Sequence, residues 1–329
     1  MRIFAMGITG FIGGQVIASL LEKRSKCHIR VLVRDEAKAQ QIAKKWANIE
    51  IVKGDLDSHD VLVEEAKKAD IVLQMADADH TGAIRSLIEG LERGTKGYYI
   101  HTSGAAFLFD VTNGFGNPSN KVSSDVTDLE AIKSLDLALP HRVADALVME
   151  LSTRASIPTA IVCPPMIYGI GAGPVKTRSI QIPRLIRAIL KREKAFTVGE
   201  GNNIWGNVHI QDVADVYLRL IEETLKPNGG AASWGQEGLY FAQAAEHRWV
   251  DAVKSIAEEA FDRDCIKTTD IDKLTAEEVS SLDPLGSILW GSNCRSNAER
   301  IQALGWQPKG PPMYESIAAE IEAELASNS

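Results

Sequence analysis

Short apolar runs alternate with amphipathic segments through the first half of the chain. Six runs rich in Ile, Val and Leu have the length and composition of buried strands, and the segments between them, such as AKAQQIAKKW and GAIRSLIEGLERG, have helical spacing. This alternation predicts an α/β fold with a doubly wound parallel sheet. The expected strands are residues 2–6, 29–34, 49–55, 69–76, 97–103 and 158–165.

The alternation loosens after residue 165. Helical patterns occur in IPRLIRAILKR, DVADVYLRLIEETL and WVDAVKSIAEEAF, with a strand-like AFTVGEG and a Gly-rich stretch at residues 228–238. We therefore expect a sheet domain at residues 1–165 and a smaller α+β lobe at residues 166–329, with some strands or helices of the lobe returning to the main sheet.

Composition and charge narrow the class of partner. The 329 residues carry a formal net charge of -8, and Lys and Arg are scattered along the chain, which argues against a nucleic-acid or membrane surface and favours a small-molecule partner. The four Cys are far apart, so neither a disulfide framework nor a metal site is expected. The first residues have a strand pattern instead of a signal-peptide h-region, and no apolar run approaches a membrane span, so the predicted location is cytoplasmic.

Three glycines separate the first strand from the first helix in GITGFIGG. Glycine is needed in such a turn because the chain bends sharply and its backbone approaches a pyrophosphate, which the helix N-terminus also attracts. The turn predicts a Rossmann-type NAD(P)-binding domain in residues 1–165 and leaves residues 166–329 as the substrate-binding lobe. Its expected cofactor-binding residues are Gly7, Thr9, Gly10, Phe11, Ile12 and Gly13.

The ends of the next strands indicate which dinucleotide binds. The second strand ends in Arg34 followed by Asp35, and neighbouring strand residues point to opposite faces, so only one of them faces the adenosine directly. We favour Arg34 pairing with a 2'-phosphate, hence NADP(H), with NAD(H) as the alternative. Asp55 and Leu56 after the third strand are expected to contact the adenine, and Ala76 and Pro164 complete the predicted cofactor site.

The motifs GITGFIGG, VLVRD, KGDLD, IVLQMAD, YIHTSG and CPPMIYGIG, followed by VHIQDVAD and LGWQP, resemble the extended short-chain dehydrogenase/reductase superfamily of NAD-dependent epimerases and dehydratases. The resemblance covers nearly the whole chain and implies a catalytic Ser, Tyr and Lys, the last two spaced as Tyr-x-x-x-Lys. Carried over by position, the Ser is Ser103, but the Tyr falls on His141 and the Lys on Asp145. The Tyr-x-x-x-Lys pair is therefore missing.

His141 and Asp145 lie four apart on an expected helix, so we predict a hydrogen-bonded acid/base pair, with a purely structural pair as the alternative. Arg142 is expected to point to another side of that helix. Tyr168 is a second candidate proton donor, with a structural role as its alternative. The resemblance also places Asp77, Asp79 and His80 near the nicotinamide, with roles as turn or core residues as the alternative. We expect Trp205, Phe107 and the loop 109–120 to line the substrate pocket, because a long unpatterned loop is typical of a lid or binding loop. His209 and Asp212 are expected to be structural, Asp212 as a helix cap.

The sequence thus favours an NADP(H)-dependent oxidoreductase that reduces a carbonyl or imine of a small organic substrate, with Ser103 polarising the carbonyl and His141 or Tyr168 moving the proton. Two alternatives stay open: a non-redox isomerase, dehydratase or cyclase, and a catalytically inactive dinucleotide sensor. The resemblance implies a homodimer.

Overall fold

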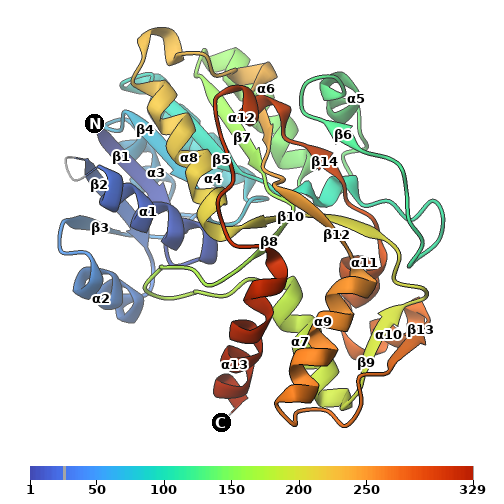
Figure 1. Cartoon of the computed structure of the whole chain (residues 1–329). Helices are drawn as coiled ribbons and strands as arrows, with labels where there is room; N and C mark the ends of the chain where they lie inside the picture. Colours follow the sequence, from blue (N-terminus) through green and yellow to red (C-terminus); the bar gives the residue numbers. More distant parts are fainter. Residues whose placement is uncertain (25–26, 329) are drawn as a thin grey trace.

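The computed structural model describes residues 1–24 and 27–328, and its centre is a seven-stranded parallel sheet (Figure 1). The strand order is β11-β7-β5-β4-β1-β2-β3. The prediction of a doubly wound α/β sheet is confirmed, with the predicted strands two to four residues shorter than expected except for β1 and β2, which have the expected length. The strands are β1 Arg2–Met6, β2 His28–Val33, β3 Ile49–Lys53, β4 Ile71–Gln74, β5 Tyr98–Thr102, β7 Thr159–Cys163 and β11 Leu239–Phe241.

Helices cover both faces of this sheet, which is why its central strands are apolar at nearly every position. On one face α1 (Phe11–Lys23) packs beside α8 (Ile210–Thr224), and on the other α4 (Thr81–Arg93) packs between α3 (His59–Ala66) and α6 (Arg142–Ala155) (Figure 1). Helix α2 (Glu36–Lys45) connects β2 to β3. The apolar stripe of α1, formed by Val16, Ile17 and Leu20, is fully buried.

Two elements of the second half belong to the main sheet. Strand β11 pairs with β7 at the sheet edge, and α8 covers the sheet beside α1. The remaining elements form the smaller lobe, which carries α7, α9 and α13 at the bottom of Figure 1. They are β8 Met166–Tyr168, α7 Gln181–Arg192, β9 Ala195–Val198, β10 Ile204–His209, β12 Ala245–Arg248, α9 Trp249–Asp262, β13 Ile271–Leu274, α10 Ala276–Leu282, α11 Gly286–Gly291 and α13 Ile317–Asn328.

The other short elements are η1 Ala105–Leu108, β6 Ser123–Ser124, α5 Leu129–Lys133, η2 Pro227–Gly229, η3 Gly235–Glu237, β14 Ser296–Asn297, α12 Glu299–Ala303 and η4 Met313–Ser316. The long loop at 109–120 is tied to the smaller lobe by Asn293, which is 2% exposed. The Asn293 side chain accepts from the Ser119 N–H at 3.1 Å and donates to the Asn117 carbonyl at 2.9 Å. The backbone of Asp110 also pairs with that of Asn293.

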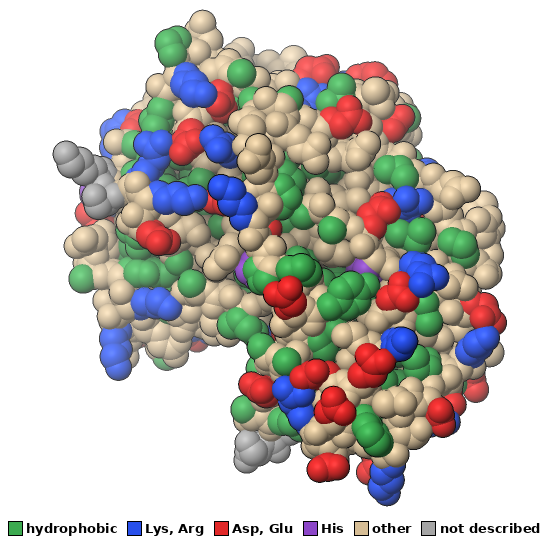
Figure 2. Space-filling model, viewed as in Figure 1, with side chains coloured by type: hydrophobic (Ala, Val, Ile, Leu, Met, Phe, Trp, Pro, Cys, Tyr) green, Lys and Arg blue, Asp and Glu red, His purple; other side chains and the backbone are tan. Residues whose placement is uncertain are grey.

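Surface charge is mixed on the face drawn in Figure 2, where Lys and Arg lie among Asp and Glu. None of the helices in the described part of the chain has the length and apolar character needed to cross a bilayer.

A buried histidine makes the stability of the fold depend on pH. His101 on β5 is 0% exposed, its Nδ1 lies 3.1 Å from the Tyr99 hydroxyl, and burial lowers its pKa to about 4. Since the unfolded chain binds the proton more readily, stability is lost as the pH falls below the unfolded value. Between pH 7 and pH 5 we expect the wild type to lose about 2 kcal/mol more unfolding free energy than His101→Gln, measured by urea denaturation. Equal losses would show that another group is responsible.

Candidate active site

The glycine turn has the tight geometry that the sequence predicts. Gly7 has φ +80°, and a Cβ there would approach the Met75 carbonyl oxygen to 2.2 Å; a Cβ at Gly13 would approach the Gly7 oxygen to 2.4 Å. A Cβ at Gly10 would meet only the Gly7 oxygen, at 3.0 Å. Gly10 is the N-cap of α1 and offers no side-chain acceptor, so the first N–H groups of this helix stay available to an anion.

The turn opens into a cavity of about 510 Å³ at the carboxyl ends of β1, β2 and β3. Crevices at this end of an open parallel sheet are where α/β folds bind dinucleotides. Of the residues predicted to bind cofactor, those that line it are Gly7, Thr9, Gly10, Arg34, Asp55, Leu56 and Ala76. Gly13 is packed beneath the turn, which fits its role in bringing α1 close to the chain.

Positive charge gathers where an adenosine ribose would lie. Arg34 is exposed, lines the cavity and makes no ion pair within the described residues. Asp35 also lines the cavity, but its carboxylate accepts from the Lys38 N–H at 2.9 Å and thereby caps α2. The Lys38 side chain is a second cationic group in the lining of this cavity, which the sequence reasoning missed because Lys38 lies in α2, beyond the strand end that was considered.

Asp55 sits at the opposite wall of the same cavity. Its Oδ1 accepts from the Ser58 hydroxyl at 2.7 Å and from the Asp57 N–H at 3.1 Å, and the Ser58 hydrogen bond holds the pKa of Asp55 below its usual value. Ser58 occupies the N-cap of α3, but its hydroxyl serves Asp55 and not the helix. The carboxylate is thus held charged, ready to accept from a donor such as an adenine amino group.

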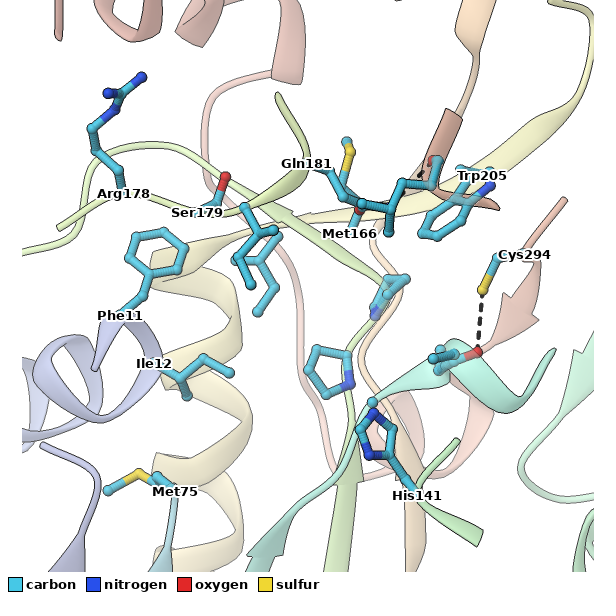
Figure 3. Close-up of a pocket in the computed structure, with 18 of the residues that line it drawn as sticks. Phe11, Ile12, Met75, His141, Met166, Arg178, Ser179, Gln181, Trp205 and Cys294 are labelled. Carbon is cyan, nitrogen blue, oxygen red and sulfur yellow. Dashed lines mark hydrogen bonds between the residues drawn. The ribbon is translucent and has the colours of Figure 1, made fainter. Parts of the chain in front are cut away.

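A second cavity, of about 500 Å³, adjoins the first, since Met75 and Ala76 line both. Phe11, Ile12 and Pro164, predicted as cofactor residues, lie here and not in the first cavity. Figure 3 shows Phe11 and Ile12 from the start of α1 on one side, Trp205, Met166 and Gln181 on the other, and His141 below them. The two cavities together have the extent expected for a dinucleotide followed by a small substrate.

His141 does not pair with Asp145, so that prediction was wrong. His141 is the N-cap of α6, with φ +66°, and this left-handed backbone points its ring away from the helix face. Its Nδ1 lies 3.0 Å from both carboxylate oxygens of Asp79, in the turn after β4. Because a carboxylate only accepts, Nδ1 donates, which leaves Nε2 free to take or give a proton. A Cβ at Gly104 would lie 3.3 Å from Nε2, so this nitrogen faces the cavity wall at Gly104.

Asp145 is fully buried and pairs with Arg142. The Arg142 Nη1 lies 3.5 Å from its Oδ2, so the expectation that Arg142 points to another side of the helix was wrong. Burial raises the pKa of Asp145 to about 6, although the Ser103 hydroxyl and Arg142 favour its charged form. Arg142, 1% exposed, also lies over the Phe107 ring at 5.6 Å. Asp145 is therefore a structural group and not a replacement for a ribose-binding Lys.

Ser103 is turned away from the cavity. It is 7% exposed, its hydroxyl lies beside Asp145, and it is absent from the described residues that line either cavity. The following residue, Gly104, lines the cavity beside the His141 ring. Successive residues of an extended segment point to opposite sides, so the position that faces the substrate is 104, where no hydroxyl is present. This placement argues against Ser103 as the group that polarises a carbonyl.

Tyr168 has a structural environment. It is 4% exposed, its hydroxyl donates to the Pro311 carbonyl at 2.9 Å, and burial raises its pKa to about 12. Its ring packs edge-on against His209, with centroids 5.4 Å apart. It is not among the described residues that line the cavities, which argues against its role as the proton donor.

The other residues singled out from the sequence divide between the cavities and the fold. Asp77 and His80 line the first cavity. His209, not Asp212, caps α8. Asp212 instead accepts from the backbone N–H groups at 309 and 310, which corrects the predicted cap.

The prediction that Trp205, Phe107 and the loop 109–120 line the substrate pocket is correct in part. Trp205 and Phe109 line the second cavity with ring centroids 5.2 Å apart, but Phe107 is buried against Phe241. Lys176 and Gln181 also line this cavity and were missed, because only the tertiary fold brings their loop over the glycine turn. The Lys176 N–H donates to the Thr9 carbonyl at 3.3 Å. The described residues contain no group of three or more His, Cys, Asp or Glu arranged to hold a metal ion.

Comparisons with known proteins agree with this geometry. Residues 7–167 match a family model described as NAD(P)H-binding, and residues 138–231 match the NAD dependent epimerase/dehydratase family. The curated protein "Oxidase ucsJ" from Acremonium sp is 34% identical over 338 aligned positions, which cover 98% of this chain and 97% of the relative.

Solved structures share the fold. The dTDP-glucose 4,6-dehydratase DesIV from Streptomyces venezuelae, with NAD and TYD bound, has a TM-score of 0.70 at 15% identity, covering 100% of this chain and 98% of its own. The UDP-glucuronic acid 4-epimerase from Bacillus cereus, in complex with UDP-glucuronic acid and NAD, has a TM-score of 0.69 at 14% identity, covering 99% and 100%. The resemblance predicted from the motifs is confirmed, and the chain belongs to the NAD-dependent epimerase/dehydratase family of extended short-chain dehydrogenase/reductases.

Proposed function

We propose that this protein is an NADP(H)-dependent oxidoreductase that acts on a carbonyl, imine or alcohol of a small organic substrate. The observation that carries the proposal is the His141–Asp79 pair, of which His141 lines the second cavity, next to the cavity of the glycine turn. The 34% identical relative named as an oxidase supports redox chemistry. Here His141 takes the place of the missing Tyr, and Asp79, which comes from a different element, takes the supporting role.

The residues present fit a bound dinucleotide. Gly10 leaves its side of the turn open, the α1 N-terminus offers free N–H groups, and Asp55 and Arg34 face the far end of the cavity. When bound, the nicotinamide supplies the hydride to the substrate carbon or accepts it. During reduction His141 Nε2 gives its proton to the substrate oxygen or nitrogen, and during oxidation it takes that proton. Asp79 holds the imidazole in place, and its own carboxylate is 56% exposed, which gives the proton a route to solvent.

The proposed preference for NADP(H) can be tested at Arg34, which is expected to contact the 2'-phosphate of the adenosine. Arg34→Ala should weaken NADPH binding by about 10- to 100-fold, the worth of one or two charge-assisted hydrogen bonds, and leave NADH binding nearly unchanged. Calorimetric titration of both cofactors measures this. Lys53→Ala, an exposed cation at the end of β3 outside both cavities, is the matched control. Equal weakening of NADPH and NADH would mean that Arg34 does not contact a 2'-phosphate.

The second candidate function is dinucleotide sensing without catalysis. It is favoured by the absence of a Tyr, a Lys and a cavity-facing Ser at the positions where relatives of this fold perform chemistry. A non-redox isomerase, dehydratase or cyclase that uses His141 and Asp79 as acid and base is the third. The test is to bind NADPH and then follow its oxidation with a panel of ketones and imines, together with mass analysis of the products. Tight binding with no oxidation and no change of any substrate supports sensing; products without net oxidation support the non-redox enzyme.

A further inference from the structure

We infer that the substrate is an uncharged, largely apolar, ring-bearing molecule with one hydrogen-bonding group away from the reacting carbon, and not a nucleotide-linked sugar. This inference rests on the proposed function, because it assigns the second cavity to the substrate. The lining of that cavity and the state of its two cationic side chains, Lys176 and Arg178, favour such a substrate.

The far wall of the cavity is an aromatic and aliphatic surface. Trp205, Phe109, Met166 and Leu289 form it, and Figure 3 shows the Trp205 ring and Met166 at the side facing away from α1. The Trp205 indole N–H is already used, since it donates to the Ser292 carbonyl at 2.6 Å. The wall therefore presents ring faces and methyl groups, which favour an apolar ligand by about 25 cal/mol for each Å² removed from water.

Arg178 lines the cavity but its charge is already neutralised. Its Nε lies 3.0 Å from a Glu320 carboxylate oxygen and its Nη1 lies 2.8 Å from one of Glu324. Both glutamate side chains are 0% exposed, so moving Arg178 away would leave the buried Glu320 carboxylate without its cationic partner. In Figure 3 the guanidinium of Arg178 points away from the other labelled side chains. Arg178 is therefore not available to a phosphate of a substrate.

Lys176 is the other cationic residue in the lining, and it lies at the cofactor end. Its side chain is exposed and makes no ion pair within the described residues, while its backbone N–H donates to Thr9 of the glycine turn. This places it beside the N-terminus of α1, where the dinucleotide phosphates are expected. With Lys176 serving the cofactor, the described lining offers no free cation to a second diphosphate.

One buried polar group in the lining has no partner among the described residues. The Ser179 hydroxyl is buried and makes no hydrogen bond within the described residues, although the residue lines the cavity. A buried hydroxyl without a partner costs free energy that a ligand can recover by supplying one hydrogen-bonding group. The neighbouring Gln181, 7% exposed, is already bonded through its Nε2 to the Leu289 carbonyl at 3.4 Å. The lining thus matches an apolar body with one uncharged polar group.

The test uses a neutral fluorescent probe, N-phenyl-1-naphthylamine, with the whole protein saturated with NADP⁺. We expect the probe to bind with enhanced fluorescence, 2-decalone to displace it, and UDP-glucose at the same concentration to leave it bound. Displacement by UDP-glucose, or no probe binding, would overturn the inference. Probe binding needs no turnover, so probe displacement without any NADPH oxidation by ketones would contradict the proposed redox function while upholding the nature of the cavity.

Variants show whether the probe occupies this cavity. Ala106→Leu adds bulk to the lining and should weaken probe binding at least about tenfold, with the affinity for NADPH retained. Ala131→Leu makes the same change at an exposed position outside both cavities and should change neither. If Ala106→Leu binds the probe as tightly as the wild type, the probe lies elsewhere and the inference is wrong.

Discussion

Replacing His141 with alanine is expected to lower turnover by about 10²- to 10⁴-fold while the affinity for NADPH stays within about twofold. The reason is that Nε2 of His141 faces the substrate cavity and is left free by the bond of Nδ1 to Asp79. No other described side chain in the lining of that cavity combines a free titrating nitrogen with an orienting carboxylate. Steady-state rates with the best substrate from the panel, and calorimetry with NADPH, measure the two quantities.

Two further variants sharpen this result. Asp79→Asn keeps the shape of its side chain but removes the carboxylate that orients His141, so we expect a smaller loss of turnover and a changed pH profile. His59→Ala removes an exposed histidine that lies outside both cavities and should leave the rate unchanged. If His141→Ala retains wild-type rates, the proton moves through another group and the role of the pair is wrong.

Gly10→Ala is expected to weaken the affinity for the cofactor at least about 100-fold, which corresponds to about 2.7 kcal/mol, while the protein still folds. Gly10 has φ -85°, which alanine adopts without strain, and its Cβ would meet only the Gly7 oxygen, at 3.0 Å, within the protein. The new methyl group would instead occupy the approach of a pyrophosphate to the backbone. Thermal unfolding without ligand and calorimetry with NADPH separate the two effects.

Gly13→Ala provides the contrast. Its Cβ would come within 2.4 Å of the Gly7 oxygen and 2.7 Å of the Gly7 carbonyl carbon, so the turn itself must distort. We expect a lower unfolding temperature even without ligand, unlike Gly10→Ala. If Gly10→Ala binds NADPH normally, the phosphates do not approach this side of the turn, and the cofactor site needs a different description.

The local sequence pattern was sufficient to predict the sheet and the glycine turn, because both depend on residues that are close together in the chain. The strand β11 was not predicted, since Leu239–Phe241 is only three residues long and its apolar run is no different from that of many core segments. The pairing of His141 was predicted from the rule for residues four apart, which requires both to be inside one helix. His141 precedes the helix with a left-handed backbone, and its partner is 62 positions away.

The direction in which the side chains point at the end of β5 could not be predicted from the sequence either. The motif match placed a serine at position 103, but the cavity faces position 104, and a shift of one residue exchanges the two sides of an extended chain. Burial of Ser103 against Asp145 and Cys163 depends on α6 and β7, which are distant in the sequence. Only the tertiary structure shows that the residue beside the His141 ring is Gly104, which has no side chain.

The pairing of β11 with β7 affects how the chain can be divided and synthesised. A fragment that ends near residue 165 would lack the outer strand and leave the backbone groups of β7 unpaired along an apolar edge, a surface that recruits other chains. On the ribosome, the cofactor-binding half cannot close its sheet until residue 241 has emerged, by which time half of the smaller lobe is already made. The two halves are therefore expected to fold as one cooperative unit, with little independence for the dinucleotide-binding part.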